Sequence, residues 1–115
     1  ISATLQRRQP DGSISGTVTG PKPAGKPLAG ICVQVVPIAR GLTPYLAETA
    51  GPKGRYRVGP LPPGRYLVEF EARCATTGYA TQWWRGAGSM NHATPVVVRG
   101  GQSHSGINAS MTPTG

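Results

Sequence analysis

Acidic residues are scarce in this chain: Asp11, Glu48, Glu69 and Glu71 are the only four, against twelve lysines and arginines, so the formal net charge is +8. Such a balance permits attraction to nucleic acid, anionic cell-wall polymers or membrane surfaces, but charge alone identifies no partner. Several arginines alternate with apolar residues, which is typical of the solvated face of a sheet and not of a groove that tracks phosphates. We therefore expect no nucleic-acid partner.

Helical periodicity and long apolar runs are also missing. No window of roughly ten residues carries apolar positions at helical spacing without an interrupting glycine or proline. No apolar run approaches the length of about 18 residues that spans a membrane, and no signal peptide is recognisable. We expect little or no helix and no membrane insertion. The start at Ile1, without an initiator methionine, favours a mature form or an excised domain.

Cysteine occurs only at Cys32 and Cys74, without the C-x-x-C spacing of a metal site. A disulfide is the simplest interpretation and implies an extracellular, secreted protein; the alternative is two reduced, buried thiols in a cytoplasmic domain. A bridge closing a loop of this length would contribute about 4 kcal/mol. The phases conflict, because Cys32 lies opposite Ile31 and Val33 on its run, whereas Cys74 is in phase with inward residues. Either the run that contains Cys32, residues 29–37, is buried on both faces, or Cys74 lies beyond the end of its own strand.

Patterns of catalytic and metal-binding residues are absent too. The two histidines, His92 and His104, lie in loops rich in glycine and serine, and neither has a nearby acid in the sequence to orient it as in a hydrolytic triad. The histidines and acids match neither zinc nor calcium spacing, and residues 59–64 lack the lysine and following helix of a phosphate-binding loop. We therefore expect no catalytic residue, no metal and no cofactor, and a protein that is not an enzyme.

The chain does contain a series of short β-prone runs. Its 17 glycines and 12 prolines cluster between runs rich in valine, isoleucine, tyrosine and threonine, as turns between strands do. The central stretch, residues 55–70, alternates apolar with charged residues on both sides of a Gly/Pro hinge and reads as a β-hairpin or corner. Its inward residues are Tyr56, Val58, Tyr66, Val68 and Phe70. Strands that are apolar on one face require a second sheet to cover them, which predicts a two-layer β-structure.

Seven such runs follow one another, at spacings of about 8 to 15 residues, and predict an all-β, seven-stranded antiparallel β-sandwich. They cover residues 13–19, 29–37, 45–50, 55–58, 65–73, 94–99 and 107–112. At 115 residues the chain is too short for two independent cores. We expect one domain over residues 13–112, a lead-in or linker over 1–12 and the start of a further linker at 113–115.

Several motifs occur in a characteristic order. They are Ile14-Ser-Gly-Thr-Val-Thr, Pro27-Leu-Ala-Gly-Ile, Glu48-Thr-Ala-Gly before Gly54-Arg-Tyr, Leu61-Pro-Pro-Gly-Arg-Tyr and the closing Gly106-Ile-Asn-Ala. In this order they resemble the carboxypeptidase-regulatory-like domains over about residues 13–112. The resemblance implies a transthyretin-like (prealbumin) sandwich of the Greek-key type. It also implies a non-catalytic, extracellular role beside neighbouring domains of a larger secreted bacterial protein, but no particular ligand.

The segment 75–93 interrupts the rhythm of strand and turn and contains both tryptophans. Loops of this length in a compact domain are usually functional or disordered. Aromatic residues make up only 6% of the chain, yet three of them fall close together here. We predict a polysaccharide site in which aromatic rings stack on sugars while polar side chains bind hydroxyl groups. Its residues are Tyr79, Gln82, Trp83, Trp84 and Arg85.

Two alternatives to this sugar site remain open. The aromatic rings could pack over the open end of the sandwich, which would make the chain a structural spacer or protein-contact domain without a glycan ligand. If the tryptophan pair lies on a short strand, one ring must point inward and the other outward. Alternatively, Arg85 beside a tryptophan could bind acidic groups of a protein or an anionic polymer.

Overall fold

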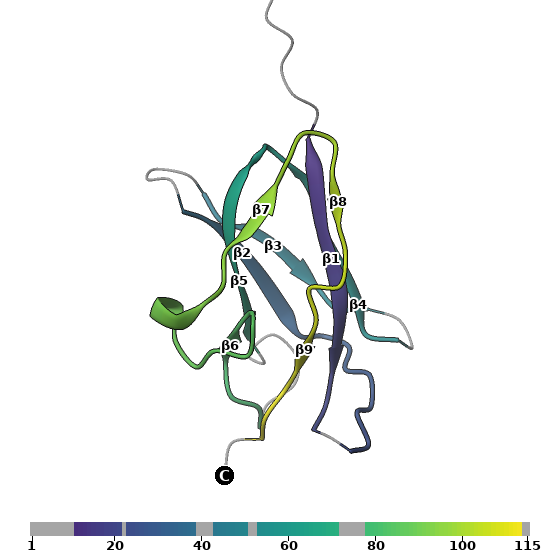
Figure 1. The fold of residues 1–115 in the computed structure, drawn as a ribbon. Helices are drawn as coiled ribbons and strands as arrows, with labels where there is room; N and C mark the ends of the chain where they lie inside the picture. The colour runs from purple at the N-terminus through teal and green to yellow at the C-terminus, as the bar shows by residue number, and fades with distance from the viewer. Residues whose placement is uncertain (1–10, 22, 39–42, 51–52, 72–77, 114–115) are drawn as a thin grey trace, which may run out of the picture.

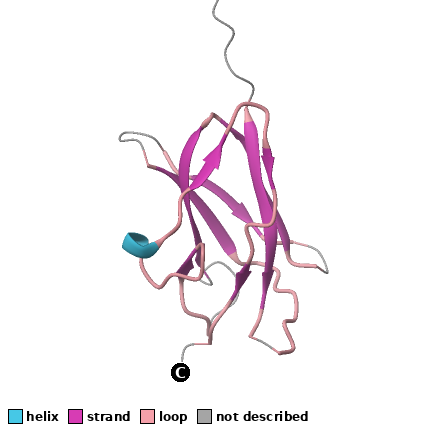
Figure 2. Cartoon of the chain, viewed as in Figure 1, coloured by secondary structure: helices cyan, strands magenta, loops and turns pink. Residues whose placement is uncertain are grey.

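The computed structural model describes residues 11–21, 23–38, 43–50, 53–71 and 78–113. These residues form nine strands and one turn of 3-10 helix, η2 (Met90–His92). The strands make two sheets, stacked as a sandwich (Figures 1 and 2). The all-β, two-layer prediction is confirmed. The predicted strand count of seven is wrong, because two further short strands form.

The smaller sheet has four strands and is built around the first one. In it β1 (Gly12–Thr19) pairs antiparallel with β4 (Arg55–Leu61). Two short late strands, β8 (Ser103–His104) and β9 (Ala109–Ser110), pair with β1 in parallel at its beginning and its end. The chain therefore returns to its first strand, so that β8 and β9 lie along β1 in Figure 1.

The larger sheet has five strands, all antiparallel. Its order is β3 (Tyr45–Glu48), β2 (Cys32–Pro37), β5 (Gly64–Glu71) and β6 (Gln82–Trp83). Strand β7 (Val96–Val98) also pairs with β5, at the end opposite to β6. The central strand β5 thus contacts β2 along one edge and both β6 and β7 along the other.

The two additional strands are β6 and β8. Strand β6 lies in the segment expected to be an irregular loop, and β8 lies in residues 100–106, expected to be a turn. Each has only two residues, too few for an alternating pattern to be visible. The predicted direction is also wrong in part, because β8 and β9 run parallel to β1 and the sandwich is not purely antiparallel. The Greek-key connection stays a prediction.

The core lies between the sheets and is built by alternate strand residues, as the pattern predicted. The five inward residues assigned to residues 55–70 are all buried, and Ala72, predicted to continue the same face, lies outside the described residues. The Tyr56 and Phe70 rings meet edge to face across the two sheets, with centroids 5.9 Å apart. Burial of each such side chain contributes roughly 2 kcal/mol. The core residues are Ile14, Val18, Ile31, Val33, Val35, Tyr56, Val58, Leu61, Tyr66, Val68, Phe70, Val96, Val98, Ile107, Ala109 and Met111.

Residue Cys32 faces the outside of the five-stranded sheet and is half-buried. It lies opposite Glu48 of β3 on one side and Glu71 of β5 on the other. Its chain neighbours Ile31 and Val33 are fully buried. This placement confirms the predicted phase of Cys32. Its predicted partner, Cys74, lies outside the described residues, so the disulfide stays a prediction.

Candidate functional site

The predicted aromatic segment folds onto the end of the central strand, and the strand register separates its side chains. Trp83 lies opposite Glu69, and Gln82 lies opposite Phe70. Paired residues of adjacent strands point to the same face. Because Phe70 is fully buried, Gln82 faces the interior and Trp83 faces outward.

Gln82 links the two sheets. Its Nε2 donates to the backbone oxygen of Ser110 at 2.9 Å and lies 3.7 Å from Sδ of Met111. Ser110 belongs to β9, so this hydrogen bond joins the five-stranded sheet to the four-stranded one. At least one amide donor that we expected to bind a sugar is therefore used inside the fold.

Trp84 follows β6 in a turn, and its side chain packs against the core. Its backbone N–H donates to the oxygen of Val68, and its own oxygen accepts from the N–H of Thr94, both at 2.8 Å. The side chain is half-buried, as is that of Tyr79, which also packs against the core. These two aromatic residues thus contribute to closing the sandwich, in line with the packing alternative.

Arg85 is exposed at the tip of the same turn. Its guanidinium carbon lies 6.0 Å from the centroid of the Trp84 ring, the distance of a cation–π contact. The turn is closed by two backbone hydrogen bonds of 2.8 Å between Trp83 and Ala87. Gly86, with φ of 69°, allows the reversal. The turn therefore exposes Arg85 over the ring of Trp84.

Trp83 extends a row of side chains across the outer face of the five-stranded sheet. The register places Leu46, Gln34, Glu69 and Trp83 side by side on β3, β2, β5 and β6. The ring of Trp83 is half-buried and is not part of the core cluster. Of the five predicted residues, Trp83 and Arg85 have the outward placement that a surface site requires.

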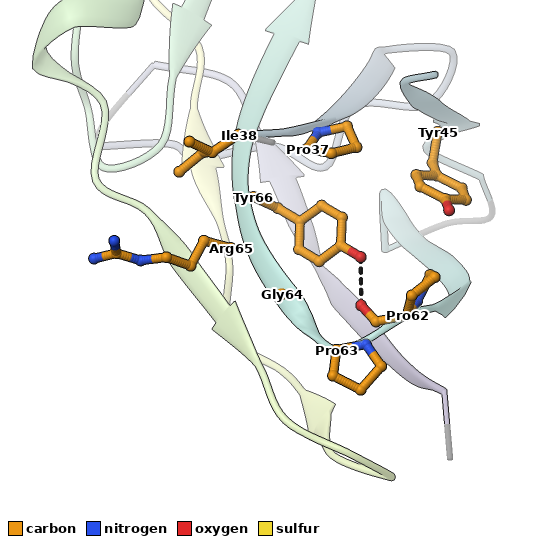
Figure 3. Close-up of a pocket in the computed structure, with 8 residues that line it drawn as sticks. All are labelled: Pro37, Ile38, Tyr45, Pro62, Pro63, Gly64, Arg65 and Tyr66. Carbon is orange, nitrogen blue, oxygen red and sulfur yellow. Dashed lines mark hydrogen bonds between the residues drawn. The ribbon is translucent and has the colours of Figure 1, made fainter. Parts of the chain in front are cut away.

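A separate hollow of about 530 Å³ lies at the other end of β5 and was missed by the sequence analysis (Figure 3). Its Tyr45 and Tyr66 rings meet edge to face at 6.3 Å. The Tyr66 hydroxyl donates to the backbone oxygen of Pro62, and burial raises the pKa of Tyr66. Arg65 points away from these rings (Figure 3). Being apolar, with the hydroxyl of Tyr66 already bonded, this hollow suits a sugar poorly. The sequence feature that could have indicated this hollow is the Leu61-Pro-Pro-Gly hinge, whose residues Pro62, Pro63 and Gly64 line it.

The side chains of His92 and Ser89 lie close together beside η2. Nδ1 of His92 is 2.9 Å from Oγ of Ser89, and both residues are exposed. Across the described residues, no three histidine, cysteine or acidic side chains gather in a way that could hold a metal ion. No helix among the described residues is long and apolar enough to cross a membrane.

The two stacked sheets, closed at one end by an aromatic turn, make the molecule an all-β sandwich domain. The family profile of the Carboxypeptidase regulatory-like domain matches residues 13–112, and the chain belongs to this family. Domains of this family are non-catalytic accessory domains. The predicted resemblance is thereby confirmed. No curated protein matches the chain.

Proposed function

We propose that this domain is the polysaccharide-binding accessory module of a secreted protein, with Trp83 as its stacking ring. The observation that carries the proposal is the register of β6, in which Trp83 lies opposite Glu69 and so faces outward. An indole on the outer face of a sheet can stack on the apolar face of a sugar while its N–H stays available for a hydrogen bond.

The surroundings of Trp83 support the same function. Arg85 adds guanidinium donors at the end of the turn, and Gln34 adds an amide in the same row of the sheet. Because the row from Leu46 to Trp83 crosses four strands, an extended polymer bound at Trp83 could continue over the outer face of the sheet. Trp84, Tyr79 and Gln82, predicted as direct ligands, instead hold the turn in place through core packing and the bond to Ser110.

A secreted location is part of the proposal. It is supported by the predicted pairing of Cys32 with Cys74, since disulfides persist in oxidising compartments. Cys32 faces outward at the end of β2, where the register places it opposite Glu71, the last residue of β5. Neighbouring domains of the same protein are the expected partners, and the polysaccharide would be the substrate that they share.

The test compares the two adjacent tryptophans. We expect Trp83→Ala to abolish retention on insoluble glucan or chitin while changing the free energy of unfolding by less than about 1 kcal/mol. We expect Trp84→Ala to lower that free energy by about 2–4 kcal/mol, because its ring packs against the core, and to keep retention where the protein is folded. Retention assays and urea titrations supply both measurements.

A matched control is Met90→Ala, which removes an exposed apolar side chain near the same turn. It should change neither retention nor stability. Retention of Trp83→Ala equal to that of the unchanged protein would reject the sugar proposal, as would an equal loss in Met90→Ala. The intrinsic fluorescence of Trp83 should also respond to a soluble fragment of the retained polymer.

A second candidate, a protein-contact domain, is favoured by apolar exposure on the same sheet. Ile38, Leu46 and Val97 are exposed by 47%, 74% and 42%, and alternation places all three on the outer face. Apolar side chains gathered on one face mark contact surfaces. This candidate predicts no fluorescence response to any glycan, together with binding to a neighbouring domain that Leu46→Gln weakens.

A further inference from the structure

The outer face of the four-stranded sheet carries a different set of side chains. In the register of β1 and β4, Thr17 lies opposite Arg55 and Ser15 lies opposite Arg57. Between these two pairs, Gly16 lies opposite Tyr56, which is buried in the core. Alternation therefore points the arginines and the hydroxyl residues away from the core, onto one polar face.

A hollow of about 330 Å³ opens on this face, between β1, β4 and the segment 105–108. The polar side chains at its border come from Ser15, Thr17, Arg55, Ser105 and Asn108. None of the residues that line it is acidic. Its volume falls within the range typical of small-ligand sites, roughly 300–1,000 Å³.

The wall formed by the late segment is held against β1 and β4 by one hydrogen bond to each strand, and it approaches β1 closely at Gly16. The N–H of Ile107 donates to the oxygen of Ser15 at 3.1 Å. The hydroxyl of Tyr56 donates to the oxygen of Ile107 at 2.6 Å. A Cβ at Gly16 would lie 2.1 Å from that same oxygen, so the approach requires glycine. The hollow is therefore a built feature of the fold.

The donors of the hollow outnumber its acceptors. Oδ1 of Asn108 accepts from the N–H of Thr17 at 2.8 Å and from its hydroxyl at 3.3 Å. The Nδ2 group of Asn108 consequently points away from Thr17 with two N–H donors. Arg55 is exposed and contributes the planar donor fork of a guanidinium group. Such a lining suits a ligand rich in oxygen acceptors and negative charge.

The distribution of charge over the two sheets points to the same ligand. Three of the four acids in the sequence, Glu48, Glu69 and Glu71, lie on the five-stranded sheet, where the register places them on its outer face. The four-stranded sheet instead carries Arg57 two residues beyond Arg55 on the same face of β4, about 7 Å further along the strand.

We propose that this hollow is a second binding site, for the carboxylate or sulfate groups of an anionic polysaccharide. A guanidinium group binds carboxylate or sulfate oxygens through two parallel hydrogen bonds. The hydroxyls of Ser15 and Ser105 and the amide of Asn108 would hold the sugar oxygens. Two arginines in line along β4 fit successive charged groups of a polymer. The site is independent of Trp83, which lies on the other sheet.

Isothermal titration of the whole chain tests this site with four probes: polygalacturonate as a carboxylated polymer, heparin as a sulfated one, a soluble neutral glucan and duplex DNA. The variant Arg55→Gln with Arg57→Gln removes both charges of the face. The matched control, Arg65→Gln with Arg99→Gln, removes the same net charge from exposed positions elsewhere. Thermal unfolding shows whether both variants keep the fold.

We expect at least one anionic polymer to bind the unchanged chain, with an affinity that falls as salt is added. The Arg55/Arg57 variant should bind roughly a hundredfold more weakly, about tenfold for each charge-assisted contact, and the control pair less than about threefold more weakly. The polygalacturonate and heparin arms decide whether the site takes carboxylate or sulfate. Trp83→Ala should leave this binding unchanged, so that the proposal for the Arg55 hollow and the proposal for Trp83 can be rejected independently.

Three results would overturn the proposal. Binding of neither anionic polymer at low salt shows that the hollow is no site for them. Equal weakening by the two arginine pairs shows that net charge alone attracts the polymer. Tighter binding of duplex DNA than of either polysaccharide shows that the face serves a different macromolecule.

Discussion

The two outer faces of the sandwich cover the same core and differ in their chemistry. The face of the five-stranded sheet combines exposed aliphatic side chains, an indole and carboxylates. The face of the four-stranded sheet combines guanidinium groups with hydroxyls and an amide. The residues that define the first face are Leu46, Glu48, Glu69, Glu71 and Trp83. Those that define the second are Ser15, Thr17, Arg55, Arg57 and Asn108.

This difference shows that a net charge of +8 is a poor description of the surface. Most of the negative charge gathers on the outer face of the five-stranded sheet. Arg55 and Arg57 lie on the other sheet, and no acid lines the hollow beside Arg55. A ligand approaching one face meets a field quite unlike that on the other. The average charge of a sandwich therefore conceals two distinct surfaces.

The largest expected loss of stability tests which side chains of β5 point into the core and which point outward. Phe70→Ala should lower the free energy of unfolding by about 3–5 kcal/mol, because the ring is fully buried and packs on Tyr56. Leu67→Ala, three positions earlier and pointing outward, should cost less than about 1.5 kcal/mol. Urea titrations measure both, and equal losses would show that the assigned alternation is wrong.

A smaller effect tests the bond that holds the wall of the polar face. Tyr56→Phe removes the hydroxyl that donates to the oxygen of Ile107. Because that oxygen lies in the interior, the free energy of unfolding should fall by about 1–3 kcal/mol. Weaker binding of anionic polymer should accompany it, since Asn108 follows Ile107 directly. Tyr45→Phe, on the other sheet, is the control and should leave polymer binding unchanged.

The free energy of unfolding at alkaline pH provides a further test of the burial of Tyr56. Burial raises the pKa of Tyr56 far above its usual range, so the folded protein keeps a proton that the unfolded chain loses near pH 10. Stability should be full below about pH 10 and should fall above it by up to about 1.4 kcal/mol per pH unit. In Tyr56→Phe this slope should be much smaller, leaving the part due to Tyr66. Urea titrations between about pH 9 and 11 measure it, and an unchanged slope would contradict the assignment.

The smallest effect concerns the apolar side of the comparison. Leu46→Gln should change the free energy of unfolding by less than about 0.5 kcal/mol, because the side chain is 74% exposed. It should nevertheless lower self-association at high concentration, which light scattering detects, if this face is a contact surface. The control Val97→Thr, also on the outer face, tests whether the effect extends to β7.

The sequence was sufficient to predict the layers and the inward residues of the long strands. Tyr56 and Phe70 were placed correctly because strict alternation allows one face only to be buried. Strands of two residues, such as β6 and β8, lack that pattern, since they form by pairing with a distant strand. Their existence depends on tertiary contacts that no local window contains.

The candidate sites show the same limit. Adjacent tryptophans would face opposite sides only if both lay on one strand, and only the pairing of Trp83 with Glu69 shows which ring faces outward. The hollow beside Arg55 was not predicted at all. It forms because Asn108 binds Thr17, 91 positions earlier in the sequence. A contact of that separation leaves no signal in composition or spacing.

The parallel pairing of β9 with β1 has a mechanical consequence. Val18 and Thr19 at the end of the first strand lie beside Ala109 and Ser110, so the chain enters the sandwich at one end and leaves it at the other. Tension between these two points would slide the strands past each other, loading the bonds from Ile107 to Ser15 and from Met111 to Thr19 together. A domain loaded in this shear geometry resists stretching, because several hydrogen bonds must break together and not one after another.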